Sequence, residues 1–88
     1  MELRYKGSFS HDIAIHNRAL LDSVRDAILN VKGAKDSSQI HHLRKLKNYH
    51  VHYRIKIAGN YRIGIIIRKN IVWFVRFGHR SNFYKKFP

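Results

Sequence analysis

The sequence has no cysteine, and its single proline is the last of its 88 residues. Without cysteine the chain can form neither disulfides nor a thiolate nucleophile. No apolar run approaches the roughly 20 residues that a membrane-spanning helix needs, and the N-terminus lacks the apolar core of a signal peptide. These features predict a single small domain that folds around one hydrophobic core in the cytoplasm.

Acidic residues are absent from most of the chain. Residues 1–36 hold six Lys/Arg and five Asp/Glu, whereas residues 37–88 hold twelve Lys/Arg and no Asp or Glu, within a formal net charge of +13. A segment without carboxylates cannot neutralise itself, so we expect its surface to attract polyanions, with nucleic acid as the partner. The alternatives, a basic protein without such a partner or a protein that binds anionic membranes, do not explain the ordered placement of the charges.

The first part of the chain has the pattern of a strand followed by helices. Residues 2–6 can form a short strand, and Ser10 or Asp12 can cap a helix after it. The apolar residues that then recur at spacings of three and four are Ile13, Leu20, Leu21, Val24, Ala27, Ile28 and Val31. This spacing predicts two helices, broken near Asn17, that bury one stripe. Residues 34–48 are mostly polar and are expected to form a loop with one helical turn.

A period of two begins at residue 51, where apolar residues alternate with cationic and polar ones. This alternation predicts a strand with one buried face and one cationic face. A three-residue turn after Ile57 would pair Ile57 with Tyr61 and Lys56 with Arg62, which keeps the two faces separate. A two-residue turn would mix them, so we expect the longer turn.

The next hairpin, by the same reasoning, pairs Ile65 with Val75 and Gly64 with Arg76. The result is an α+β fold in which helices cover one face of an antiparallel sheet. The opposite face would gather four cations around Gly64, namely Arg54, Lys56, Arg62 and Arg76. A solvated sheet face normally mixes charges of both signs, because like charges on neighbouring strands destabilise the sheet. A face that binds phosphate is therefore the preferred interpretation.

Three motifs in the second half of the chain resemble those of RelE-type toxins in the RelE/ParE superfamily. They are Tyr53-Arg-Ile-Lys-Ile, Gly59-Asn-Tyr-Arg-Ile and Phe77-Gly-His-Arg-Ser-Asn-Phe-Tyr84. The resemblance implies one RelE-like domain over residues 1–88 with the element order β-α-α-β-β-β. It also implies the toxin of a type II toxin-antitoxin system that cleaves mRNA on the ribosome without a metal or other cofactor.

The motifs place the family's catalytic positions on individual residues of this chain. These are Arg54, Lys56, Arg62, Arg80 and Tyr84. Arg54 departs from the pattern, because lysine is frequent at this position in the family. Some relatives use a glutamate or histidines as acid and base, and the absence of any carboxylate after Asp36 argues against the glutamate version. The basic cluster is then the expected catalytic machinery.

Metal-free cleavage of RNA requires a base for the 2′-hydroxyl, stabilisation of the phosphate charge and an acid for the 5′-oxygen. Lys56 is the expected base, because a lysine among cations loses its proton more readily than an arginine. Arg62, supported by Arg54 and Arg76, would hold the phosphate. The resemblance favours Arg80 as the acid over His79, which titrates nearer neutral pH but would point to the opposite face of an extended strand.

Other basic and aromatic residues have less specific roles. The further residues expected to contact RNA or phosphate are Arg44, Lys45, Lys47, His52, Arg76 and His79. Tyr84 would either stack on a base or pack as a tail aromatic, whereas Phe83, Phe87 and Trp73 are expected to be packing residues. His50 and His52 could form half of a metal site, but no cysteine or nearby carboxylate completes it, so no metal is expected.

The resemblance also implies partners. They are an acidic antitoxin, the ribosome with its mRNA, and operator DNA bound only by the toxin-antitoxin complex; no membrane is expected. The charge pattern independently favours an acidic, partly disordered antitoxin segment. Two alternatives remain open: a ParE-like inhibitor of DNA gyrase, which needs no catalytic cluster, and a basic RNA-binding module without catalysis.

Overall fold

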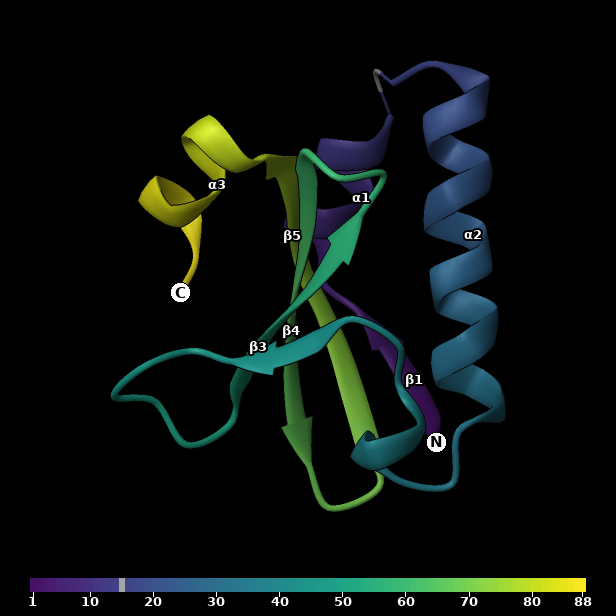
Figure 1. Cartoon of the computed structure of the whole chain (residues 1–88), viewed down its shortest axis with the longest axis vertical. Coiled ribbons are helices and arrows are strands. Elements are labelled where there is room, and N and C mark those ends of the chain that lie inside the picture. The colour runs from purple at the N-terminus through teal and green to yellow at the C-terminus, as the bar shows by residue number, and fades with distance from the viewer. Residues whose placement is uncertain (15) are drawn as a thin grey trace.

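The computed structural model describes residues 1–14 and 16–88 (Figure 1). Its elements are β1 (Glu2–Tyr5), α1 (Gly7–Ile13), α2 (Arg18–Gly33), the 3-10 turn η1 (Ser37–Gln39), β2 (Leu43–Lys45), β3 (His52–Ile57), β4 (Tyr61–Arg68), β5 (Ile71–His79) and α3 (Arg80–Lys86). The strands form one sheet in the order β1-β5-β4-β3-β2. The predicted α+β fold with two N-terminal helices is confirmed.

The sheet is mixed rather than antiparallel, because β1 pairs with β5 in parallel. Two elements were not predicted. Strand β2 lies in the polar stretch expected to be a loop, where Leu43 alone faces a buried partner, Ile55. Helix α3 lies on the opposite side of the sheet from α2, as Figure 1 shows. The sheet therefore has an inner face towards α2 and an outer face towards α3.

The break between the helices lies where the sequence predicts it. Asn17 caps α2, and its side-chain oxygen accepts a hydrogen bond from the backbone N–H of Leu20 at 2.9 Å. The predicted caps of the first helix were wrong: Ser10 and Asp12 lie inside α1, and Lys6 holds the cap position without a side-chain hydrogen bond. None of the helices in the described ranges is long and apolar enough to cross a membrane.

The register of the first hairpin is as predicted, with Ile57 opposite Tyr61 and Lys56 opposite Arg62. The second hairpin is only partly as predicted. Gly64 lies opposite Arg76, but a bulge after Gly64 puts Phe74, not Val75, opposite Ile65. A bulge inserts one residue into a strand, and the simple alternation used for the prediction does not include it.

The core lies between α1, α2 and the inner face of the sheet. Its fully buried residues include Phe9 and Val31 from the helices and Ile55, Ile63 and Phe74 from the strands. This burial is the main source of the stability of so small a domain. The expectation that Trp73 also belongs to the core was wrong: it is half-buried and lies on the outer face, opposite Ile66 and Arg4.

Candidate functional site

Four of the five predicted catalytic residues lie at one end of the outer face. Arg62, Arg80 and Tyr84, together with His79 and Ser81, line an open hollow of about 480 Å³. Lys56 is the neighbour of Arg62 on the adjacent strand. The hollow lies where the β3–β4 hairpin meets the start of α3, and the backbone N–H of Arg80 donates to the Asn60 carbonyl at 2.7 Å. We call this group the Arg62 hollow.

The turn before β4 holds the guanidinium of Arg62 in place. Its Nη1 donates to the carbonyl oxygens of Gly59 at 2.8 Å and Tyr61 at 2.9 Å. Its Nε is buried and has no hydrogen-bond partner. A guanidinium that is oriented before an anion arrives loses less conformational entropy on binding it. Arg62 is thus a fixed positive charge beside the hollow.

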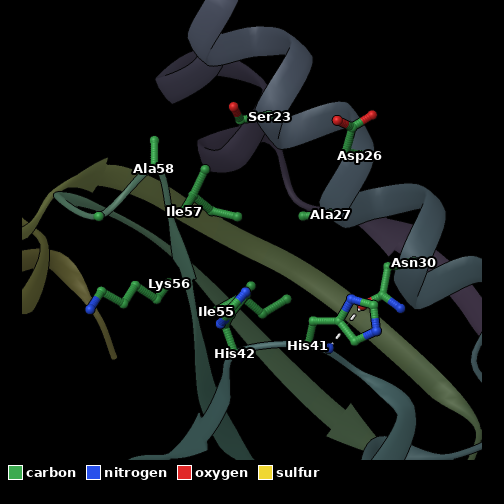
Figure 2. Close-up of a pocket in the computed structure, with 11 residues that line it drawn as sticks. Ser23, Asp26, Ala27, Asn30, His41, His42, Ile55, Lys56, Ile57 and Ala58 are labelled. Atoms are coloured by element: carbon green, nitrogen blue, oxygen red, sulfur yellow. Dashed lines mark hydrogen bonds between the residues drawn. The ribbon is translucent and has the colours of Figure 1, made fainter.

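Arg54 and Lys56 lie on the same face but differ in how far their side chains are exposed. Arg54 is half-buried, and its Nη1 donates to the carbonyl oxygen of His42 at 2.8 Å. Lys56 is exposed. A groove of about 400 Å³ lies between α2 and the end of β3, and Figure 2 shows the Lys56 side chain pointing away from Asp26 and Asn30 on the helix side of that groove. The ammonium group of Lys56 therefore lies away from the carboxylate of Asp26.

The centre of the predicted cationic face is not open. Phe87, which is 2% exposed, lies flat on Gly64, and a Cβ at Gly64 would come within 2.7 Å of the ring. An aromatic ring over a strand glycine covers the backbone that the missing side chain leaves bare. The ring separates Arg54 from Arg76, so the four cations do not form the single cluster that the sequence predicted. Phe83 and Phe87 are buried packing residues, as expected.

Arg76 is neutralised by a residue from the first part of the chain. Its Nε lies 3.0 Å from Oδ2 of Asp12, and its Nη2 donates to Oδ1 at 3.2 Å. Asp12 is itself buried and accepts a hydrogen bond from the backbone N–H of Phe77 at 2.9 Å. α1 thereby covers the edge of β5 beyond the end of β1. The phosphate-binding role predicted for Arg76 is untested, and this ion pair does not favour it.

The chain bends between His79 and Arg80, where β5 ends and α3 begins. His79 caps α3: its Nδ1 accepts a hydrogen bond from the backbone N–H of Ser81 at 3.1 Å. The extended-strand geometry on which the predicted opposite orientation of His79 and Arg80 rests ends at His79, because Arg80 begins α3, and both residues line the same hollow. With Nδ1 used by the cap, only Nε2 of His79 is left for a ligand.

The other residues predicted to contact RNA or phosphate do not lie together. Arg44 lies on the outer face opposite Arg54, whereas Lys45 lies on the other face and its Nζ donates to the Tyr49 carbonyl at 2.8 Å. Lys47 is exposed in the loop after β2. The ring of His52 lies 5.6 Å from that of Phe87, and its Nδ1 is buried without a partner.

No potential metal ligands gather in groups of three within residues 1–14 and 16–88. The sequence predicted Asp12 only as a possible helix cap and did not predict its ion pair with Arg76. The sequence does show an acidic residue next to apolar residues of the same helix, which suggests a buried carboxylate. Nothing in the sequence indicates that Arg76 is its partner.

No family model matches the sequence. Toxin RelE3 of Methanocaldococcus jannaschii is 46% identical over 46 residues, which are 52% of this chain and 51% of that protein. The match thus spans about half the length of that relative. A chain of the RelB-RelE antitoxin-toxin complex from Methanococcus jannaschii has a TM-score of 0.80 and 27% identity, over 97% of this chain and 99% of that chain.

More distant structures share the fold alone. YafQ from E. coli has a TM-score of 0.64 at 12% identity, over 91% of this chain and 93% of that chain. The protein HP0894 from Helicobacter pylori has a TM-score of 0.63 at 17% identity, over 92% of this chain and 96% of that chain. The local identity to Toxin RelE3 and the full-length likeness to the RelB-RelE complex support the predicted resemblance to the RelE-like toxin superfamily.

Proposed function

We propose that this protein is the toxin of a type II toxin-antitoxin system and that it cleaves mRNA on the ribosome without a metal ion. The observation that carries this proposal is the Arg62 hollow, where Arg62, Arg80 and Tyr84 gather beside Lys56. A fixed guanidinium, an amine and a second guanidinium at one point can supply the charge stabilisation, the base and the acid that cleavage of RNA requires. An exposed aromatic ring beside them can stack on a base.

The proposed reaction is attack of a ribose 2′-hydroxyl on its own 3′-phosphate. Lys56, as the neutral amine, takes the proton of the 2′-hydroxyl, and the 2′-oxygen forms a bond to phosphorus. Arg62 stabilises the negative charge that develops on the phosphate oxygens. The bond from phosphorus to the 5′-oxygen breaks, and Arg80 donates a proton to that oxygen. The products are a 2′,3′-cyclic phosphate and a free 5′-hydroxyl.

Tyr84 is proposed to stack on a base beside the reacting phosphate. It is 52% exposed, and its ring meets Phe83 only edge to face, at 5.0 Å between ring centroids. Phe83, which is 1% exposed, fills the position against the sheet instead. This division favours stacking over the alternative that Tyr84 is a tail aromatic packed on the core.

The proposed partners follow from charge and from the relatives. The RelB-RelE and DinJ-YafQ structures are antitoxin-toxin complexes. A net charge of +13 with no acidic residue after Asp36 favours an acidic antitoxin segment that folds over the basic surface. The same charge favours association with ribosomal RNA, and we propose that operator DNA is bound only by the toxin together with its antitoxin.

Primer extension on a defined mRNA in purified translating ribosomes tests the proposal. The wild type is expected to cut at discrete positions, and Lys56→Ala and Arg62→Ala should cut about 100-fold or more slowly at equal ribosome occupancy. Arg25→Ala is the matched control, because it removes one positive charge from the exposed surface of α2, on the other side of the sheet.

A fourth variant separates the two candidate acids. His79→Asn keeps a residue suited to cap α3, but its amide is too weak an acid to transfer a proton to the leaving oxygen, so this variant should cut at nearly the wild-type rate if Arg80 is the acid. A loss as large as that of Lys56→Ala would assign the acid to His79. If the wild type leaves every message intact, the nuclease proposal is rejected, and inhibition of gyrase supercoiling becomes the next assay.

A further inference from the structure

The outer face continues beyond Phe87 into a second positively charged surface, at the end of the sheet where β4 turns into β5 (Figure 1). Trp73 lies there, and the Nζ of Lys6 lies 4.7 Å from the centroid of its ring. Ile66 and Arg68 complete a shallow hollow of about 300 Å³. We call these four residues the Trp73 platform. It is separate from the Arg62 hollow and shares no lining residue with it.

The indole is not needed for the core. Trp73 is absent from the buried cluster, and its neighbours across the strands are Arg4 and Ile66 on the same outer face. The contact with Lys6 is an exposed cation–π contact, which is weaker than the stacking of a nucleic-acid base on an aromatic ring. A base can therefore displace the ammonium group from the ring, after which Lys6 remains beside it to meet a phosphate.

The charge around the indole favours a polyanion. Arg4 forms an ion pair with Glu2 at 2.9 Å, so it adds little to the local potential. Neither Lys6 nor Arg68 has an ion-pair partner in the part of the chain that the structure describes. Two uncompensated cations on either side of an aromatic ring match the alternation of phosphate and base in a single strand.

The two surfaces lie on one path. Arg62 and Arg68 are six residues apart on β4 and point to the same face, so they are about 20 Å apart at the usual rise of a strand. The side chains of His52 and Phe87 lie between the two arginines on this face. A single strand of several nucleotides can span this distance along the sheet.

We propose that the Trp73 platform binds a flanking nucleotide of the RNA strand whose scissile phosphate lies in the Arg62 hollow. The base stacks on Trp73, and the phosphates on its two sides lie beside Lys6 and Arg68. The proposal rests on the proposed function in that RNA is the ligand of both surfaces. It adds a binding subsite that takes no part in the reaction.

The protein contains one tryptophan, so its intrinsic fluorescence reports on the platform directly. The probes are 2′-O-methyl oligoribonucleotides, which cannot undergo attack by the 2′-oxygen. One is long enough to span both surfaces, and a shorter one fills only the Arg62 hollow. We expect the long probe to quench the fluorescence of Trp73 on binding and the short probe to leave it unchanged.

Substitutions then test each part of the platform. Trp73→Leu should weaken binding of the long probe about 5- to 150-fold and leave binding of the short probe unchanged. Trp73→Phe should retain most of the affinity, and it remains informative if the leucine variant does not fold. Lys6→Gln and Arg68→Gln should each lower the salt dependence of long-probe binding by about 0.7 in log–log slope. Lys32→Gln and Arg25→Gln remove equal charges from α2 and should change this slope little.

The outcomes separate this proposal from the proposed function. If mRNA is cut by the wild type and spared by Lys56→Ala, but the long probe binds Trp73→Leu as tightly as the wild type and does not quench the fluorescence of the wild type, the platform is rejected and the nuclease stands. If the long probe quenches Trp73 but no message is ever cut, the nuclease is rejected and the platform stands. Quenching by polyglutamate but not by RNA would overturn the platform in favour of an acidic protein partner.

Discussion

The contact between Phe87 and Gly64 makes a quantitative prediction. Gly64→Ala would place a methyl carbon 2.7–2.8 Å from three atoms of the Phe87 ring. That distance is about 1 Å shorter than an ordinary carbon–carbon contact. The ring must move, and overpacking of this kind costs about 1–3 kcal/mol of the free energy of unfolding.

A double-mutant cycle isolates this contact. Phe87→Ala alone should cost about 3 kcal/mol, because the ring is buried and packs against Phe83 at 5.4 Å between centroids. Once the ring is gone, Gly64→Ala should stabilise the protein by about 0.5–1 kcal/mol, since alanine loses less backbone entropy than glycine on folding. The expected coupling energy between the two positions is therefore about 1.5–4 kcal/mol.

Urea unfolding, followed by the fluorescence of Trp73 and by far-UV circular dichroism, measures all four proteins of the cycle. Gly78→Ala is the control: Gly78 also lies in a strand on the outer face, but a Cβ there would meet nothing within 4 Å. Equal costs for Gly64→Ala with and without Phe87, or a cost no larger than that of Gly78→Ala, would refute the packing of Phe87 on Gly64.

Three further changes test other contacts. Asp12→Asn removes a buried carboxylate from its ion pair with β5 and should lower the free energy of unfolding by about 1–3 kcal/mol in urea titrations, whereas the exposed Asp26→Asn should change it little. Asn17→Ala removes the cap of α2 and should cost about 0.5–2 kcal/mol, with a lower Tm by calorimetry. Ser38→Ala should raise the pKa of Asp36 in an NMR titration, because the hydroxyl and then the backbone N–H of Ser38 lower that pKa; an unchanged pKa would contradict these bonds.

The local pattern of the sequence determined every strand except β2, and it determined one hairpin register. Alternation with a period of two assigns each side chain to a face, and a slip of one residue would move Lys56 and Arg62 into the core. That constraint alone predicted the pairing of Lys56 with Arg62. Asn17 likewise marked the break between the helices, because a cap acts on the backbone within its own turn. The RelE-like motifs additionally predicted which cations form one catalytic site.

Tertiary structure alone decided which cations are free to bind a ligand. The docking of α1 brings Asp12 to Arg76, and the return of the chain after α3 puts Phe87 over Gly64. These residues are far apart in the sequence, and no period or cap links them. Trp73 and His79 differ from their predicted positions for a related reason. The bulge in β5 moves Trp73 to the outer face, and the bend from β5 into α3 changes the geometry at His79, whereas a regular strand would fix both directions. Local periodicity determines which face a residue is on, whereas the docking of distant elements determines what covers that face.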